Sequence, residues 1–245
     1  MKHRSTAASL TVRLALLVVA CGFGGCASAP SFSTMVAAPQ SAADQTPAVK
    51  PESTDTLPPK QAAEACFATA QKLQAHGDAK EAIVLYERAR QLNPQERRVS
   101  RFLALLYDQQ GDDRLALKEY HKALELAPRD ADLLSDFGYY YYRRHDWKQA
   151  EVEFRKAIAE SPENERAWVN LGLALGEQER FAESYDAFAK VLGPAAAHSN
   201  VGVILAAHQR STEAEAQFKQ ALAIQGDLPQ ARAFLAHFEQ PSTTP

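Results

Sequence analysis

The side chains that could carry chemistry in this chain of 245 residues are its seven histidines, thirty acidic residues and three cysteines. A zinc protease needs two histidines one helical turn apart, in the pattern H-E-x-x-H, and no histidine here is followed by glutamate. The glycine cluster at 22–25 could suggest a phosphate-binding loop, but it lies within an apolar N-terminal stretch. We therefore predict a protein that is not an enzyme, with no catalytic residue, metal site, cofactor or small-molecule substrate.

Ionisable and phenolic side chains outside any motif are interpreted structurally. His145 falls in a break between two helical segments, and His198 occupies a position expected in the core. Among four consecutive tyrosines, helical periodicity points Tyr141 inward and turns Tyr139 and Tyr142 elsewhere. Four carboxylates are expected on solvated helix faces: Glu151, Glu153, Glu160 and Glu163.

Small and aromatic side chains, in contrast, recur with a fixed period, and such a period decides the fold before any local propensity does. Steps of 34, 34, 34 and 30 residues separate one set of small residues: Ala82, Ala116, Ala150, Ser184 and Ala214. The same steps separate the aromatic residues one helical turn later: Tyr86, Tyr120, Phe154, Phe188 and Phe218. A third set with these steps comes earlier in each unit: Ala70, Ala104, Gly138, Gly172 and Gly202. The shared period predicts five pairs of amphipathic helices.

Each residue type in the repeat has a packing reason. Two helices cross closely only where one side chain is very small, so glycine or alanine lies at the contact and an aromatic ring fills the groove. Pro94, Pro128 and Pro162 end the second helix of three pairs, because proline lacks the amide donor that would continue it. One pair buries only one of its faces, so successive pairs must stack into a solenoid.

At these positions the chain resembles the tetratricopeptide repeat (TPR) family. The residues that carry the resemblance best are 167–172, AWVNLG, followed by Phe188, and Gly138 followed by Ala150 and Phe154. The resemblance implies an all-α fold, a right-handed superhelical TPR solenoid of about five helix-turn-helix repeats with a C-terminal capping helix. The expected bounds within 61–240 are 63–96, 97–130, 131–164, 165–194, 195–228 and a cap at 229–240, before a frayed tail at 241–245.

The fourth repeat departs from the pattern of the others. Ser184 and Val191 stand where alanine is expected, and the repeat is four residues shorter around 192–194. These departures leave the angle between the fourth and fifth repeats open, while the predicted fold stays the same.

The first 25 residues have the layout of a secretory signal, in which basic residues precede an apolar run and small residues follow. A cysteine at the cleavage point resembles the lipobox of bacterial lipoproteins, where that cysteine becomes the lipid-bearing N-terminus. Cys26 is the favoured cysteine, and Cys21 is the alternative. The apolar run is too short for a transmembrane anchor. Residues 26–60 would then be the lipidated cysteine and a disordered tether rich in alanine, serine, threonine and proline.

This reading predicts an exported chain, lipid-anchored to a bacterial envelope membrane, with the solenoid on the periplasmic or extracytoplasmic side. The formal net charge of −3 and the lack of a base-reading motif argue against nucleic acid as a partner. Once the signal is removed, Cys66 is the remaining unmodified cysteine, and we expect it to be a small core residue.

The resemblance also implies a binding surface, because the first helix of each TPR unit lines a concave groove. The positions that face this groove select Phe67, Gln71, Arg98, Arg101, Phe102, Leu105, Asp132, Ser135, Asp136, Tyr139, Tyr142, Arg143, Arg166, Val169, Asn170, Leu173, Ser199, Asn200 and Val203. The expected anchors of a partner are Arg98, Arg101, Phe102, Tyr139, Tyr142, Arg143, Arg166, Asn170 and Asn200.

The predicted chemistry of this groove follows from those anchors. Asn170 and Asn200 match positions that hydrogen-bond the main chain of an extended peptide in similar proteins, whereas the family's lysine-rich carboxylate clamp is not reproduced. The arginines are expected to form a positive strip. We therefore expect a protein partner, a peptide or helix segment that is acidic or bears aromatic side chains.

The predicted function is a non-enzymatic protein–protein interaction scaffold, lipid-anchored in the bacterial cell envelope. Two narrower versions stay open. One is an assembly lipoprotein for type IV or tight-adherence pili and their secretins, and the other is a recruiter of cell-wall enzymes.

Overall fold

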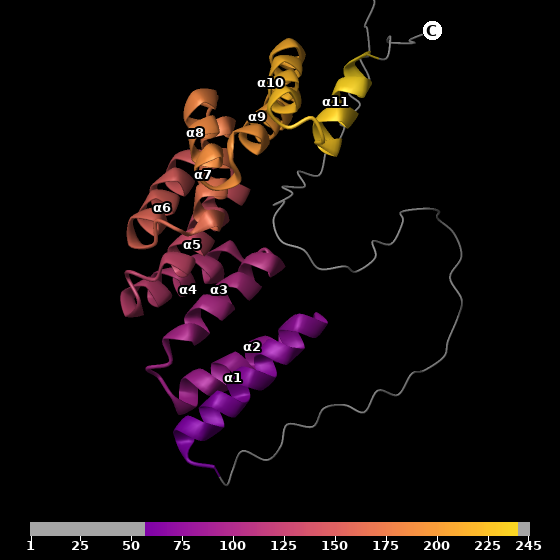
Figure 1. Ribbon diagram of the computed structural model, residues 1–245. Coiled ribbons are helices and arrows are strands. Elements are labelled where there is room, and N and C mark those ends of the chain that lie inside the picture. The colour runs from indigo at the N-terminus through magenta and orange to yellow at the C-terminus, as the bar shows by residue number, and fades with distance from the viewer. Residues whose placement is uncertain (1–56, 240–245) are drawn as a thin grey trace, which may run out of the picture. The chain divides into compact units, whose positions relative to one another are not determined.

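The computed structural model describes residues 57–239, and the regular structure in that range is α-helical (Figure 1). In chain order the helices are α1 (Pro59–His76), α2 (Ala79–Leu92), α3 (Arg97–Gln110), α4 (Asp113–Leu126), α5 (Ala131–Arg143), α6 (Trp147–Glu160), α7 (Glu165–Glu177), α8 (Phe181–Leu192), α9 (Pro194–Ala207), α10 (Ser211–Ile224) and α11 (Pro229–Glu239). The predictions for the signal segment, for Cys21 and Cys26 and for the tail lie outside the described residues.

These helices form five successive pairs followed by one further helix, so the predicted all-α repeat architecture is confirmed. Contacts join α1 to α2, α3 to α4, α7 to α8 and α9 to α10, and α11 packs against α10. None of these helices is long and apolar enough to cross a membrane.

The described residues divide into two compact parts, and each is treated separately below. We call residues 57–144 with 156–162 the N-terminal part, and residues 145–155 with 163–239 the C-terminal part. The N-terminal part therefore contains α1 to α5, and the C-terminal part contains α7 to α11.

Glycine is required where helices of one pair cross in the C-terminal part. A Cβ atom at Gly172 would lie 2.8 Å from Cε1 of Phe188, and one at Gly202 would lie 2.8 Å from Cε1 of Phe218. Both rings are fully buried, so neither can move aside without disturbing the core. Ser184, which departs from the alanine of other repeats, is tolerated because its buried hydroxyl donates to the carbonyl oxygen of Gly172 at 2.7 Å.

The turn between the two helices of each pair repeats one backbone conformation. Gly77 and Gly111 have φ values of 90° and 77°, in the left-handed region. Three residues with side chains take the same region at the equivalent turns, with φ near 60°: His145, Glu179 and Gln209. His145 therefore lies in a helix-to-helix turn, as predicted, and its backbone strain is imposed by the repeat geometry.

Aromatic rings fill the core of the N-terminal part. Tyr140 is 4% exposed and packs with Phe137 and Tyr120, at ring-centroid distances of 5.9 and 5.3 Å. Tyr141 is only partly buried against this cluster, and Tyr139 is 46% exposed. Tyr141 packs against the core as predicted, with its ring centroid 4.7 Å from that of Phe137. The more deeply buried tyrosine is Tyr140, which the pattern left unassigned; residues three and four positions after Phe137 share its helix face.

The thiol of Cys66 lies in the apolar core between α1, α2 and α3, with 5% of the residue exposed. It is a free cysteine, as predicted. Burial raises the pKa of the thiol, which favours the protonated, unreactive form.

Ion pairs between successive repeats accompany the apolar packing. In the N-terminal part, Nη1 of Arg90 on α2 donates to both carboxylate oxygens of Glu119 on α4, at 2.8 and 2.9 Å. The Glu119 side chain is 5% exposed. Asp108 on α3, also buried, accepts from Nη1 of Arg144 at 2.9 Å. Each of these pairs links one repeat to the next, so buried charge is matched by charge from the neighbouring helix.

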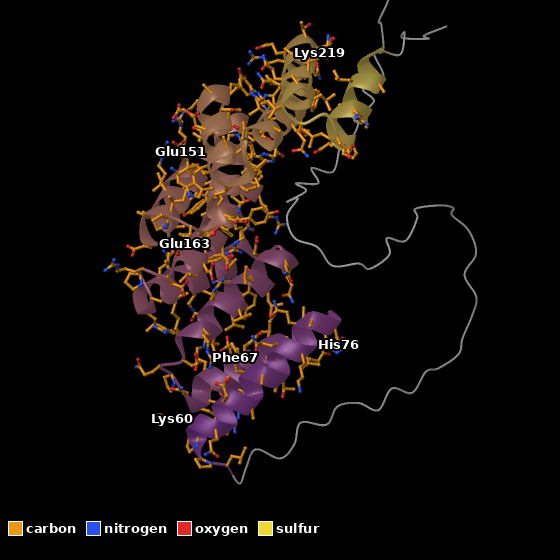
Figure 2. All side chains as sticks on the ribbon, in the orientation of Figure 1. Lys60, Phe67, His76, Glu151, Glu163 and Lys219 are labelled. Atoms are coloured by element: carbon orange, nitrogen blue, oxygen red, sulfur yellow. The ribbon has the colours of Figure 1, made fainter. Side chains whose placement is uncertain are left out.

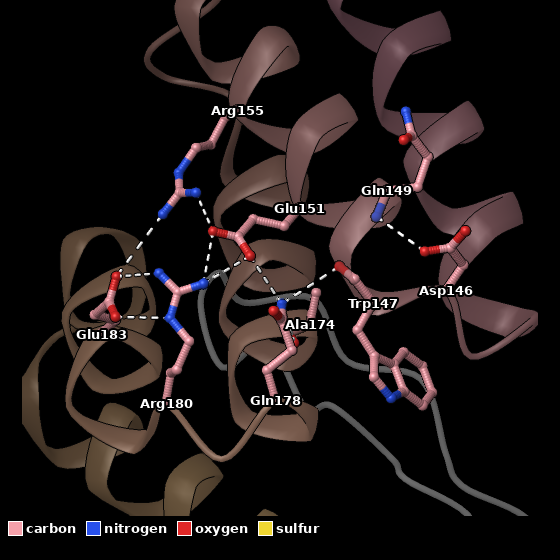
Figure 3. Close-up of polar contacts among 9 residues, drawn as sticks. All are labelled: Asp146, Trp147, Gln149, Glu151, Arg155, Ala174, Gln178, Arg180 and Glu183. Atoms are coloured by element: carbon pink, nitrogen blue, oxygen red, sulfur yellow. Dashed lines mark hydrogen bonds and ion pairs between the residues drawn. The ribbon is translucent and has the colours of Figure 1, made fainter.

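A related network surrounds Glu151 in the C-terminal part (Figure 3). Nη1 of Arg180 donates to its two carboxylate oxygens at 2.8 and 2.7 Å, and Nε2 of Gln178 donates to Oε2 at 2.8 Å. Arg155 is a further donor. Burial opposes ionisation of Glu151, but these hydrogen bonds and nearby charges outweigh it and hold its pKa below the ordinary value.

The expectation of solvated faces is wrong for two of the four glutamates. Glu151 and Glu153 are 6% and 3% exposed, while Glu160 and Glu163 lie at the surface. Glu151 is shielded from solvent because Arg180, in the next repeat, binds its carboxylate. The sequence pattern of α6 alone contains no information on this partner.

Candidate functional site

A cleft of about 520 Å³ opens in the N-terminal part, between α1, α3 and the start of α5. We call it the N-terminal cleft. Its lining residues are Phe67, Gln71, Glu96, Arg97, Arg98, Arg101, Phe102, Ala127, Asp130 and Leu133. The predicted groove set contributes five of them: Phe67, Gln71, Arg98, Arg101 and Phe102. The first helices of adjacent repeats thus bring these side chains together.

Phe67 and Phe102 lie at the floor of the N-terminal cleft, and the ring of Tyr86 packs behind them. Phe102 stacks on Tyr86 with centroids 5.4 Å apart, and it meets the edge of Phe67 at 5.3 Å. Tyr86 is fully buried, and its hydroxyl donates to Oε1 of Gln74 at 3.0 Å. Phe67 lies on α1, between Lys60 near the start of the helix and His76 at its end (Figure 2). Because each ring is held by its neighbours, the floor is preformed for an apolar side chain.

Two of the predicted anchors at the rim are already bound to carboxylates. Nε of Arg98 donates to Oε1 of Glu96 at 2.7 Å, and its Nη2 also contacts Glu64. Hydrogen bonding from Arg98 holds the pKa of the Glu96 carboxyl below its ordinary value. Nε of Arg101 donates at 2.7 Å to Oδ2 of Asp136, which is 6% exposed. The expected positive strip is therefore wrong for these two arginines, because their charge is offset within the protein.

Arg98 has a second structural contact. Its guanidinium carbon lies 4.3 Å from the centroid of the Phe67 ring, a cation–π geometry. The guanidinium therefore covers Phe67, and Leu133 is only 1% exposed, so the partly exposed Phe102 is left as the large apolar side chain that a ligand can contact in the cleft.

Tyr139, Tyr142 and Arg143 lie near the C-terminal end of α5 and do not line the N-terminal cleft. The two tyrosine rings stack with centroids 6.1 Å apart and an interplanar angle of 14°. Nη1 of Arg143 donates to Oδ2 of the buried Asp108 at 3.0 Å. This second patch presents aromatic surface beside an arginine that is fixed by its ion pair.

The C-terminal part holds a smaller cleft of about 320 Å³ at the ends of α8 and α10 and the start of α11. It is lined by Leu192, Ala196, Ser199, Asn200, Gln225, Leu228, Pro229 and Gln230. Nδ2 of Asn200 donates to the carbonyl oxygen of Ala196 at 3.0 Å, one turn earlier in α9. Arg166 and Asn170 lie on α7 and do not line this cleft. His198, half-buried, contacts Oε1 of Gln217 through Nδ1 at 2.7 Å.

The sequence pattern missed the other five lining residues of the N-terminal cleft, which are Glu96, Arg97, Ala127, Asp130 and Leu133. In the smaller cleft it missed Leu192, Ala196, Gln225, Leu228, Pro229 and Gln230, the last two of which begin α11. A signal existed only for Arg97, as one of three closely spaced arginines at the start of a predicted helix.

These features define a class of protein: a chain of helical pairs whose clefts are suited to binding. In the segment 57–239, no group of three or more histidine, cysteine or acidic side chains has a geometry that could hold a metal ion. TPR profiles match residues 73–135 and 135–197, and the chain belongs to the tetratricopeptide repeat family. The TPR fold is a scaffold for protein–protein interactions, and this chain has that fold.

Solved structures share the fold at low sequence identity. PilF from Pseudomonas aeruginosa is 20% identical with a TM-score of 0.57, over 74% of this chain and 90% of PilF. PilW, a type IV pilus biogenesis factor, is 17% identical with a TM-score of 0.58, over 73% and 92% of the two chains. YrrB, a TPR protein with an unusual peptide-binding site, is 21% identical with a TM-score of 0.54, over 70% and 90%. No curated protein sequence matches the chain significantly.

Proposed function

We propose that this protein is a lipid-anchored scaffold of a bacterial cell envelope that holds a segment of a partner protein in the N-terminal cleft. The observation that carries the proposal is the aromatic floor of Phe102 and Phe67, backed by the buried ring of Tyr86, in a cleft lined by residues from three successive repeats. A buried apolar anchor in a fitted pocket is the usual energetic centre of a protein interface. The partner segment therefore inserts an aromatic or branched aliphatic side chain against Phe102.

Envelope location rests on the sequence of the first 26 residues, with its basic start, apolar run and cysteine. The narrower role in pilus assembly is supported by the shared fold with PilF and PilW, of which PilW is a type IV pilus biogenesis factor. Recruitment of cell-wall enzymes is the alternative role, and nothing in the clefts favours it over the first.

Site-specific photocrosslinking in the native bacterium tests the binding site. A benzophenone side chain placed at the cleft residue Gln71 should capture a defined partner segment, whereas one at exposed Lys118 on α4 should not. Phe102→Ala should weaken the crosslink at position 71 at least about tenfold, the effect of losing a hot-spot side chain. The melting temperature of each variant is measured in parallel. Equal capture at positions 71 and 118 would place the binding site elsewhere. So would capture at position 71 that is unchanged in a folded Phe102→Ala variant.

A separate experiment tests the anchor. Mass spectrometry of the mature protein should find an acylated Cys26 as its first residue, and Cys26→Ser should release the protein from the membrane fraction. Cys21→Ser serves as the matched control and should leave processing unchanged. A lipid found on Cys21, or a mature chain without lipid, would refute the assignment of Cys26.

A further inference from the structure

Three arginines line the N-terminal cleft, and they differ in how their charge is used. Arg98 is held by Glu96 and Glu64, and Arg101 by Asp136. Arg97, the first residue of α3, is exposed and makes no side-chain hydrogen bond or ion pair with any residue from 57 to 239. It acts on Glu96 through its charge alone.

Glu96 and Asp130 are the two carboxylates that line the cleft, and neither forms a hydrogen bond or ion pair with Arg97. Glu96 accepts from Nε of Arg98 at 2.7 Å, and a carboxylate oxygen of Asp130 accepts from the backbone nitrogen of Leu133 at 3.0 Å. An additional carboxylate entering near Arg98 or Arg101 would compete with an existing ion pair. One entering at Arg97 would break no hydrogen bond or ion pair made by residues 57–239, so Arg97 is where a charged ligand gains most.

Arg97 and Phe102 both line the N-terminal cleft. They are five residues apart on α3, which corresponds to about 7.5 Å along the helix axis and a rotation of about 140° round it. An extended peptide advances by about 3.3 Å per residue, so a few residues cover such a separation. A short ligand segment can therefore place one side chain on Phe102 and another at Arg97.

We propose that Arg97 determines the specificity of the N-terminal cleft by binding an aspartate or glutamate within a few residues of the apolar anchor of the partner segment. This inference rests on the proposed function, since it presumes that the cleft holds a peptide. It adds the chemistry of that peptide: a short segment that carries an apolar side chain and a nearby carboxylate. The acidic preference comes from Arg97 alone, because Arg98 and Arg101 are already paired.

Short synthetic peptides test this chemistry directly. Fluorescein-labelled GGFGDGG and its reverse-order form GGDGFGG are titrated with the full-length protein in detergent, each beside the analogue with asparagine in place of aspartate. At least one acidic peptide should bind about fivefold tighter than its asparagine analogue at low salt, the effect of one partly exposed ion pair. The difference should shrink as salt rises.

Variants assign the preference to Arg97. Arg97→Gln should abolish the difference between aspartate and asparagine peptides, while Arg114→Gln, at an exposed arginine on α4, should preserve it. An acidic preference that survives Arg97→Gln, equal binding of acidic and neutral peptides, or no binding by any of them would overturn the proposal. If the crosslinker at position 71 still captures a partner, and Phe102→Ala weakens that capture, then the cleft binds a protein segment and only the proposed role of Arg97 is refuted.

Discussion

Replacing Gly172 by leucine should lower the free energy of unfolding by about 3 kcal/mol, at the upper end of the range for overpacked cores. Even a Cβ atom at this position would lie 2.8 Å from the ring of Phe188, which is fully buried and cannot rotate away. The additional carbons of leucine must push α7 and α8 apart. Urea denaturation followed by circular dichroism measures the loss.

Ala182→Leu provides the matched control for this substitution. Ala182 lies on α8 like Phe188, but it is exposed, so the added side chain meets solvent. Its effect should stay within about 0.5 kcal/mol. Similar losses from the two leucine variants would show that the tight crossing at Gly172 does not limit stability.

Replacing Arg90 by alanine should cost about 3 kcal/mol, because it leaves Glu119 as a buried carboxylate without its cation. Arg90 donates to both oxygens of Glu119, whose side chain is 5% exposed. The cost arises chiefly from stranding the charge, so the double variant Arg90→Met with Glu119→Leu should recover most of it. Thermal and urea unfolding of Arg90→Met, Glu119→Leu and the double variant give the coupling energy.

Arg129→Ala is the control for an ion pair of the same type at the surface. Nε of Arg129 lies 2.8 Å from Oε2 of Glu160, but the arginine side chain is 82% exposed. Its loss should cost less than about 1 kcal/mol. A double variant of Arg90 and Glu119 that is no more stable than Arg90→Ala would show that the arginine contributes by packing and not by matching the buried charge.

The ion pairs between repeats also shape the binding surface. Arg98, Arg101 and Arg143 all belong to the set selected as concave-face residues, and each donates to a carboxylate of a neighbouring helix. Their guanidinium groups thereby hold repeats together and fix the walls of the surface. In the proposed binding mode, recognition then falls to the aromatic floor and to Arg97, with apolar complementarity as the main source of affinity and charge as a selective addition.

The sequence by itself determined the helical repeat, because its signal is periodic and local. Glycine or alanine at one helix and an aromatic ring at the other are demanded by a crossing that every repeat shares, as Gly172 with Phe188 and Gly202 with Phe218 show. The family resemblance likewise selected Phe67, Arg98, Arg101 and Phe102, which the structure brings to one cleft. Cys66 was assigned to the core correctly for the same reason, since its place follows from the period of α1.

Only the tertiary structure decided how the charged side chains are used. Glu151 has the sequence context of a solvated helix face, yet Arg180, 29 residues later, covers it. Arg101 was expected to be available to a ligand, but it is bound by Asp136 on α5, the first helix of the following repeat. The identity of such partners depends on how one repeat sits on the next, and helical periodicity within one segment contains no information on that. For the same reason Arg97 could be recognised as the unpaired arginine of the cleft only after its neighbours were seen to be occupied.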